Sequence, residues 1–290
     1  MSDVGRPFAK GHGTGNDFVL LPDPTGVLGL TGEQVAALCD RRTGIGGDGV
    51  LRVVPSALMS DGLADASNGA EWFMDYWNAD GSVAQMCGNG VRVFATYLVD
   101  AGLAQPGRFS VGTRAGPRAV HVHADGMVTV DMGPATFPGP DGVEVRVPGP
   151  PAAWRPAVAV DVGNPHAVVF VDDLAEAGRL CEPPQVRPEQ AFPAGVNVEF
   201  AVVVGPDHLA MRVHERGVGE TQSCGTGACA VFAATVARSG LGGTQAWTVD
   251  VPGGRLQLVA RPDGAIELTG PAVLVAHGTL DPGWLEDTRP

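Results

Sequence analysis

Residues 215–229 read ERGVGETQSCGTGAC, and the rest of the chain is best interpreted outward from this stretch. Its cysteine, Cys224, is followed by Gly-Thr-Gly and, after Ala228 and Cys229, by the alanine-rich run AVFAATVARSG, residues 230–240. Such a run predicts a buried helix that ends at Gly240. Cys224 then lies at the helix N-terminus, where unpaired N–H groups and the helix dipole favour a thiolate and lower the thiol pKa. The alternative is an inert, buried cysteine beside a glycine turn.

A second copy of this pattern lies in the first half of the chain. Cys87 is followed by Gly-Asn-Gly and by the apolar run VRVFATYLVDAG, residues 91–102, which predicts another helix. Upstream of the two cysteines, residues 15–18 (GNDF) and 163–166 (GNPH) occur in the same order. The repeated order indicates an internal duplication with one cysteine in each half.

The composition narrows the classes of protein to which the chain can belong. Its 290 residues predict two domains, each with its own core. A net charge of −13 and a pI near 4.8 make nucleic acid and anionic membranes poor partners, but do not exclude a small amino-acid substrate. No stretch is apolar enough to span a bilayer, and we expect no secretory signal in MSDVGRPFAKGHG. Five cysteines, an odd and sparse set, favour free thiols in the cytoplasm.

The sequence offers little for a cofactor or a metal ion. Lys10 is the only lysine, so a pyridoxal phosphate Schiff base would depend on it alone, and we expect no such cofactor. His121 and His123 share one face of a predicted strand, but two ligands without a third are too few for a metal site. Residues 44–49 (GIGGDG) match a dinucleotide fingerprint by letter. A helix is predicted before them and a strand after them, which is the reverse of the order that this fingerprint requires.

Many short predicted strands with one long apolar helix in each half indicate an α+β fold. We expect two pseudo-symmetric domains, each a curved, mainly antiparallel sheet wrapped around a central helix. The proline-rich segment after Asp131 marks the boundary between residues 1–130 and residues 131–275. The last strand, within residues 276–290, is expected to return to the first domain.

Two thiols suit the racemisation or epimerisation of a carbon centre. A thiolate removes a proton from one face while a thiol delivers a proton to the other, and the roles exchange in the reverse direction. The negative charge that develops on the substrate carboxylate needs hydrogen-bond donors. Backbone N–H groups of residues 88–89 and 225–226, at the two predicted helix N-termini, can supply them. The pattern therefore favours a two-base isomerase.

The sequence resembles the diaminopimelate epimerases, which convert LL- to meso-diaminopimelate for lysine and peptidoglycan synthesis without a cofactor. The motifs HGTGNDF, NADGSVAQMCGNG, GNPHAVVF, GVNVEF and ERGVGETQSCGTGA occur in the order of that family across essentially the whole chain. The resemblance implies two similar domains, each a sheet rolled around a helix, with the site in the cleft. It also implies a homodimer, because many members form one.

The resemblance implies roles for individual residues. Cys87 and Cys224 match the acid/base cysteines, and His166 and Glu215 match the pair that supports them. The implied substrate-binding set is Asn16, Asn78, Gly88, Asn89, Asn164, Asn197, Glu215, Arg216, Gly225 and Thr226. Arg216 matches the arginine that grips a substrate carboxylate through two hydrogen bonds. Some members carry a glutamine where this chain has Gly49, so that contact is not carried over.

Two alternatives stay open at this point. The first is another two-cysteine amino-acid racemase of the same fold, such as a proline racemase relative. Those proteins typically carry histidine rather than Asn89 after the first Cys-Gly and lack the run at residues 215–221, so these residues favour the epimerase. The second is a non-catalytic binding protein in which Cys87 and Cys224 form a structural disulfide. The cysteine usage argues against a disulfide.

Overall fold

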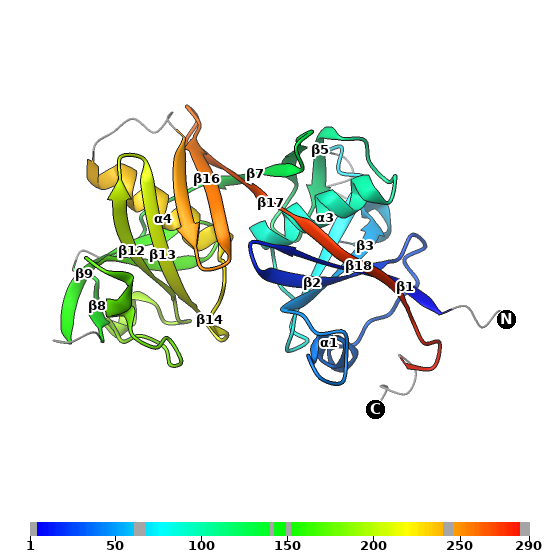
Figure 1. The fold of residues 1–290 in the computed structure, drawn as a ribbon, viewed down its shortest axis with the longest axis horizontal. Coiled ribbons are helices and arrows are strands. Elements are labelled where there is room, and N and C mark those ends of the chain that lie inside the picture. The colour runs from blue at the N-terminus through cyan, green and yellow to red at the C-terminus, as the bar shows by residue number, and fades with distance from the viewer. Residues whose placement is uncertain (1–4, 61–67, 140–141, 149–151, 240–245, 285–290) are drawn as a thin grey trace. The chain divides into compact units, whose positions relative to one another are not determined.

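The computed structural model describes residues 5–60, 68–139, 142–148, 152–239 and 246–284. The chain divides into two compact units, Met1–Val130 with Pro271–Pro290, and Asp131–Gly270. The first unit takes the chain back at Pro271 rather than at residue 276, because the returning strand already pairs with β1 at Val273. Each unit is α+β, with a mixed, mainly antiparallel sheet that curves around one helix (Figure 1).

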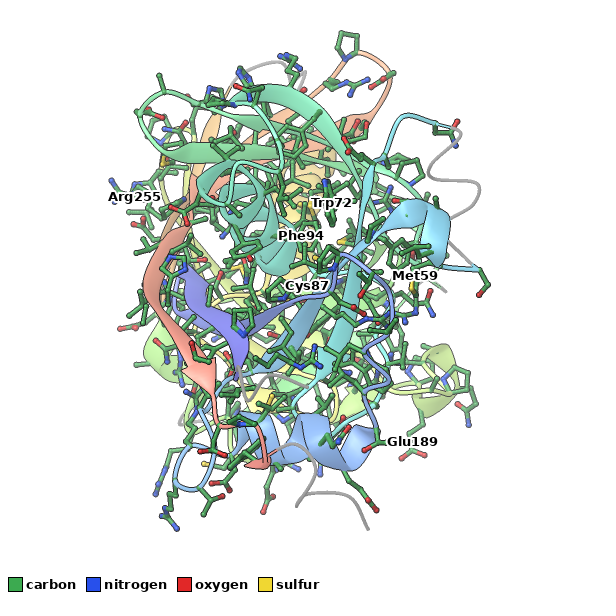
Figure 2. All side chains as sticks on the ribbon, turned by 90° about the vertical axis from the view of Figure 1, so that its right-hand side faces the viewer. Met59, Trp72, Cys87, Phe94, Glu189 and Arg255 are labelled. Atoms are coloured by element: carbon green, nitrogen blue, oxygen red, sulfur yellow. The ribbon has the colours of Figure 1, made fainter. Side chains whose placement is uncertain are left out.

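In the first unit, eight strands surround the helix α3. The elements are β1 (Arg6–Gly13), β2 (Asn16–Pro22), α1 (Gly32–Cys39), β3 (Gly49–Pro55), β4 (Trp72–Asn78), α3 (Gly88–Asp100), β5 (Gly107–Gly112), β6 (Arg118–Val122), β7 (Met127–Pro134) and β18 (Val273–Leu280), with the short 3-10 helix η1 (Ser56–Leu58) after β3. The helix α3 contacts β1, β2, β3, β4, β6 and β18, and its Phe94 is fully buried (Figure 2). The sheet therefore encloses the predicted first helix.

The second unit repeats this plan around α4. Its elements are β8 (Glu144–Val147), β9 (Ala153–Asp161), β10 (Pro165–Phe170), β11 (Val186–Arg187), β12 (Asn197–Gly205), β13 (His208–Glu215), β14 (Gly219–Glu220), α4 (Gly225–Ser239), β15 (Trp247–Val251), β16 (Gly254–Ala260) and β17 (Ala265–Pro271), with the 3-10 helices η2 (Leu174–Ala177) and η3 (Glu189–Ala191) between β10 and β12. The helix α4 contacts β9, β10, β12, β13, β15 and β16. Its predicted end at Gly240 lies outside the described residues.

The strand pairings show the internal duplication directly. From β1 to β7, successive pairs are antiparallel, parallel, antiparallel, parallel, antiparallel and antiparallel. The series β9, β10, β12, β13, β15, β16 and β17 follows the same six directions. The central helix also enters at the same place, after the fourth strand of each series. The repeat that two cysteine motifs indicated therefore extends to the whole topology.

The strand register identifies which residues of the two units are equivalent. Phe18 lies opposite Gly49 in the parallel pair β2–β3, and His166 lies opposite Asn197 in the pair β10–β12. Counting from these pairs makes Asn16 equivalent to Asn164. It also makes Leu51 equivalent to Glu199. Among the ten residues expected to bind substrate, Asn16 and Asn164 therefore hold equivalent positions in the two units.

Local sequence signals explain the elements around the first cysteine. Thr31 caps α1, accepting from the Gln34 N–H while the Gln34 side chain accepts from the Thr31 N–H. The helix ends at Cys39, because the Asp40 carboxylate accepts from the backbone of Arg42 and Thr43 and turns the chain. The GIGGDG stretch connects α1 to β3, which confirms the order that argued against a dinucleotide fingerprint.

A buried arginine fixes the start of α3 against two other segments. The Arg92 side chain is fully buried, and its guanidinium donates to Thr14 Oγ1, Gly88 O and Pro271 O. Thr14 belongs to the tight β1–β2 turn, where it and Gly15 adopt positive φ angles. Arg92 therefore ties that turn and the returning chain to the helix turn that carries Cys87.

Candidate active site

Cys87 and Cys224 each lie directly before the central helix of their unit and cap it. The Gly90 N–H donates to Cys87 Sγ at 3.4 Å, and the Gly227 N–H donates to Cys224 Sγ at 3.3 Å. In both cases the donor is the third residue after the cysteine, the usual partner of an N-cap side chain. The sequence prediction that the two cysteines lie at helix N-termini is confirmed.

In the first unit, Asn16 contacts the cysteine. Its Oδ1 lies 3.7 Å from Cys87 Sγ, within reach of a thiol proton, and accepts from Asn89 Nδ2 at 3.2 Å. Asn16 lies at the start of β2, directly after the Thr14–Gly15 turn, and Asn89 is fully buried in the first turn of α3. The structure therefore brings together three residues that the sequence assigned to the site.

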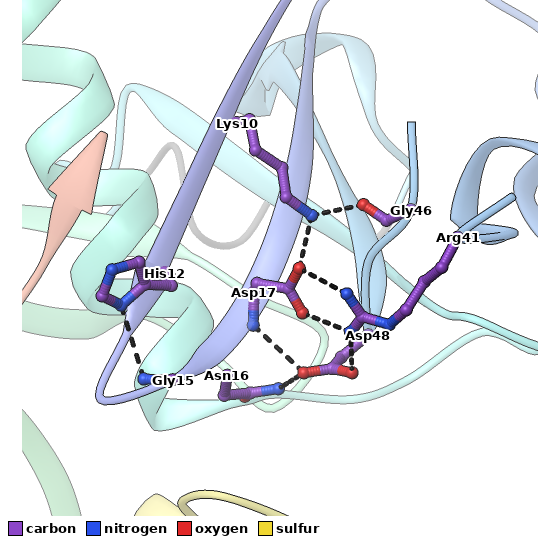
Figure 3. A network of polar contacts seen from close by, with 8 residues as sticks. All are labelled: Lys10, His12, Gly15, Asn16, Asp17, Arg41, Gly46 and Asp48. Atoms are coloured by element: carbon purple, nitrogen blue, oxygen red, sulfur yellow. Dashed lines mark hydrogen bonds and ion pairs between the residues drawn. The ribbon is translucent and has the colours of Figure 1, made fainter. Parts of the chain in front are cut away.

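A charged network behind Asn16 holds it in place (Figure 3). The Asp48 carboxylate accepts from Asn16 Nδ2 at 2.8 Å and from the Asp17 N–H at 3.1 Å. Arg41 bonds both carboxylates, and Lys10 Nζ forms an ion pair with Asp17 at 2.6 Å. Burial raises the pKa of Asp17, but hydrogen bonds from Arg41 and Lys10 outweigh it and hold the pKa well below its usual range. The only lysine is thus part of this network.

In the second unit, Cys224 lies in a far more polar setting. Cys224 Sγ is 3.4 Å from Thr226 Oγ1, and hydrogen bonds from Thr221 and from the Cys224 thiol reach the Glu215 carboxylate. Burial raises the pKa of Glu215, and the neighbouring Glu199 adds to this rise. The expected partnership of Glu215 with the second cysteine therefore has a direct contact.

A fully buried pair lies beside this cysteine. His166 Nδ1 is 2.6 Å from Glu199 Oε1, and both side chains are inaccessible to solvent. The second ring nitrogen, His166 Nε2, lies 2.9 Å from Asn164 Oδ1. A Cβ atom added to Gly227 would lie 2.8 Å from Glu199 Oε1 and 3.3 Å from Cys224 Sγ. The glycine therefore leaves room for the Glu199 carboxylate against the start of α4.

The expectation of a lowered thiol pKa at Cys224 was wrong. Burial raises the pKa of Cys224 well above its usual value, and the negative charges of Glu215 and Glu199 raise it further. The Thr226 hydroxyl and the Gly227 N–H oppose this rise but do not overcome it. A helix N-terminus contributes about 0.3–1 kcal/mol, which is small beside the cost of burying an unpaired charge. Cys224 is therefore a thiol at neutral pH.

Three other expected residues take more structural positions. The Asn197 amide donates to Pro165 O at 3.1 Å and its oxygen accepts from the Arg216 N–H at 2.9 Å, so it fastens β10 to the end of β13. The exposed Arg216 side chain donates to Ala194 O at 2.8 Å. Asn78, at the end of β4, donates to Ser82 Oγ at 3.0 Å. These contacts fix the ends of strands beside the two cysteine-bearing turns.

Glu199 and Arg92 were missed by the sequence interpretation, although a signal was present for each. Glu199 interrupts the apolar strand NVEFAVVVG, and Arg92 interrupts the apolar helix run VRVFATYL. Charged residues are almost never fully buried without a partner, so a charge within such a run points to a buried polar contact. Three further acidic residues, Asp17, Asp48 and Glu220, form ion pairs, the last with Arg212.

Several other features of the described residues lie outside the surroundings of Cys87 and Cys224. A cavity of about 700 Å³ in the second unit is lined by residues including Phe170, Arg238 and Trp247, at the C-terminal end of α4 and so at the opposite end from Cys224. All five cysteines are free thiols. Within the described ranges we find no cluster of acidic, histidine and cysteine side chains that could hold a metal ion. Among the described helices, none is both long and apolar enough to cross a membrane.

The fold matches that of solved isomerase structures. A predicted epimerase from Pseudomonas aeruginosa superposes with a TM-score of 0.69 at 16% identity, covering 95% of this chain and 99% of that chain. A probable proline racemase from Agrobacterium radiobacter has a TM-score of 0.67 at 15% identity, covering 97% and 95%. At such low identity these matches show the fold alone. They agree with two α+β domains of racemase and epimerase type.

Sequence comparison identifies the family. The diaminopimelate epimerase family model matches residues 8–138 and 158–275. A diaminopimelate epimerase from Streptomyces coelicolor is 59% identical over 284 residues, covering 96% of each chain. A second, from Thermobifida fusca, is 52% identical over 276 residues, covering 94% of this chain and 97% of that protein. The protein is an isomerase, and the chain belongs to the diaminopimelate epimerase family.

Gly90 and Gly227, whose N–H groups donate to the two cysteine sulfurs, provide a matched test of the packing beside the cysteines. We expect Gly227→Ala to lower kcat by about 100-fold, because its methyl group would displace the buried Glu199 carboxylate and shift Cys224. Gly90→Ala should be tolerated, because the added atom would make only ordinary contacts of 3.4–3.6 Å with Cys87, Leu51 and Phe18. Steady-state kinetics with circular dichroism would compare the two. Equal losses in both variants would contradict the distinction.

The low pKa of Asp17 predicts how stability depends on pH. A carboxyl group whose folded pKa is depressed stabilises the fold above its unfolded pKa of about 3.8, and this contribution disappears as pH falls towards the folded pKa. Asp17→Asn should therefore lower the urea midpoint at neutral pH, and the difference from the native protein should shrink below about pH 4. Asp125→Asn, at an exposed turn, is the control. A difference that stays constant with pH would exclude this account.

Proposed function

We propose that this protein epimerises LL-diaminopimelate to meso-diaminopimelate without a cofactor, in lysine and peptidoglycan precursor biosynthesis. The observation that carries the proposal is the pair of cysteines that cap the two equivalent helices of a chain in the diaminopimelate epimerase family. Both caps place a sulfur at a helix N-terminus, which suits chemistry on a carboxylate-bearing substrate.

The mechanism uses the two thiols on opposite faces of the same α-carbon. A thiolate takes the α-proton, the electron pair of the C–H bond delocalises into the carboxylate, and the thiol of the other cysteine returns a proton to the opposite face. Because burial and the neighbouring carboxylates raise the pKa of Cys224, we assign Cys224 as the initial proton donor and Cys87 as the initial base. After one turnover these states are reversed, and the reverse reaction or proton exchange restores them.

The remaining roles follow from chemistry and position. Backbone N–H groups of Gly88, Asn89, Gly225 and Thr226 stabilise the charge that develops on the carboxylate. Arg216, whose side chain is exposed, binds a substrate carboxylate through paired hydrogen bonds. The other residues proposed to bind or support substrate are Asn16, Asn78, Asn164, Asn197, His166 and Glu215.

The alternative of a proline racemase relative is less well supported. The solved proline racemase shares the fold at 15% identity, whereas curated diaminopimelate epimerases reach 59%. Asn89 after the first Cys-Gly and the run at residues 215–221 also match the epimerases rather than that group. We further propose that the protein is a cytoplasmic homodimer, which sedimentation velocity of the purified protein would test.

Epimerisation can be tested by incubating the reduced protein with LL-diaminopimelate in D2O. We expect the meso isomer to appear with deuterium at the inverted α-carbon. Chiral chromatography would measure the meso isomer, and mass spectrometry would measure the deuterium. L-Proline and trans-4-hydroxy-L-proline, offered in parallel, should not be inverted. Inversion of those ring amino acids without turnover of diaminopimelate would move the protein to the alternative class.

Removing either thiol should abolish turnover. Cys87→Ala and Cys224→Ala should each lower kcat by about 10²–10⁴-fold, since each removes one partner of the proton transfer. Cys181→Ala, at an exposed cysteine, should leave the rate unchanged. Full activity in either of the first two variants would refute the two-base assignment.

A further inference from the structure

The two equivalent asparagines, Asn16 and Asn164, are held in opposite orientations by their neighbours. A carboxylate can only accept hydrogen bonds, so the contact between Asp48 Oδ2 and Asn16 at 2.8 Å requires the amide NH2 of Asn16 to face Asp48. The carbonyl oxygen of Asn16 consequently faces Cys87 and Asn89. The Asn16 side chain therefore presents an acceptor to the first cysteine.

Asn164 is oriented the other way. Its Oδ1 lies 2.9 Å from His166 Nε2, and a carbonyl oxygen can only accept, so Nε2 carries a proton and donates to it. The other ring nitrogen is anchored on Glu199 at 2.6 Å, and burial of both His166 and Glu199 prevents the ring from turning. With its oxygen engaged, Asn164 keeps its NH2 group for a ligand.

These orientations differ because the duplicated positions behind the asparagines have diverged. Phe18 and Leu51 in the first unit are equivalent to His166 and Glu199 in the second, and both of the former are fully buried and apolar. At these two equivalent positions no polar side chain can therefore engage Asn16 as His166 engages Asn164. Instead, the carboxylate of Asp48, one residue before β3, accepts a hydrogen bond from the NH2 group of Asn16. His166 contacts the other end of the Asn164 amide, its oxygen.

We propose that Asp48 and His166 are positioning residues that give the duplicated site a chemical direction. Asp48 fixes Asn16 as a hydrogen-bond acceptor, and His166 fixes Asn164 as a donor. An α-amino acid has a cationic ammonium group, which needs acceptors, and an anionic carboxylate, which needs donors. Two identical asparagines would bind these groups in either arrangement, whereas oppositely fixed asparagines select one. This inference rests on the proposed function, in which both half-sites bind one substrate.

The test for Asp48 compares two substitutions. Asp48→Ala removes the acceptor and frees the Asn16 amide to rotate, and we expect kcat to fall about tenfold or more. In Asp48→Asn, the side-chain oxygen can still accept from Asn16 and from the Asp17 N–H, so this variant should keep most of the activity despite losing the Arg41 ion pair. If both variants lose activity equally, the charge and not the orientation matters, and the proposal is overturned.

The orientation of the Asn16 amide can also be measured by NMR, independently of enzyme activity. In ¹H–¹⁵N spectra of the unliganded protein, the Asn16 side-chain amide, assigned by its loss in Asn16→Ser, should show one strongly hydrogen-bonded proton. This signature should persist in Asp48→Asn and disappear in Asp48→Ala. An unchanged Asn16 amide signal in Asp48→Ala would overturn the proposal even if the protein proves to be an active epimerase. An absence of epimerase activity would refute the proposed function and leave this reading of the orientation to stand.

For the second asparagine, Asn164→Asp keeps an acceptor for His166 Nε2 but removes the donor. We expect KM for diaminopimelate to rise about 10- to 100-fold with a smaller change in kcat, because a donor to a charged group is lost from substrate binding. An unchanged KM would show that the Asn164 NH2 does not bind substrate and would overturn its assignment as the donor.

Discussion

The structure depends on one interaction that occurs twice, the hydrogen bond from a helix N–H to the sulfur of a capping cysteine. It places Cys87 and Cys224 at the only end of each central helix where unpaired N–H groups can receive a carboxylate. A helix with its N-terminus open to a ligand needs support from the sides. In each unit, the curved sheet supplies that support by contacting the helix with six strands.

The same strand topology carries different electrostatics in the two units. The first cysteine is partly exposed and contacts the neutral amide of Asn16, and the charges that stabilise this region, Asp48 and Arg41, are one step removed. The second cysteine is buried beside two carboxylates, Glu215 and Glu199. A duplicated scaffold can thus keep its geometry while each copy acquires its own proton affinity. This is the arrangement that a reaction with one donor and one acceptor requires.

The sequence predicted the α+β class, both central helices and both caps because these depend on local signals, namely apolar periodicity and a Cys-Gly pair before a helix. It could not predict the raised pKa at Cys224. That shift depends on burial, on Glu215 and on Glu199, and Glu199 lies 25 residues before the cysteine on strand β12 and approaches it only through the tertiary fold. The contact between Asp48 and Asn16, which lie 32 residues apart in the sequence, could not be predicted for the same reason. Sequence motifs identify which groups are present, and packing decides how each is oriented and charged.

The raised pKa of Cys224 fits catalysis better than the lowered one that its helix position suggested. In the proposed two-base mechanism, two thiolates would supply two bases and no acid, so one cysteine keeps its proton. The N–H groups at the start of each helix favour a thiolate at both cysteines. Only a difference in the local surroundings can therefore give the two thiols different pKa values. Burial and the carboxylates of Glu215 and Glu199 provide the difference at Cys224, against the weaker effect of the Thr226 hydroxyl and the Gly227 N–H. The divergence of Leu51 and Glu199 from a common position therefore adds to the effects of burial and of Glu215 that raise the pKa of Cys224.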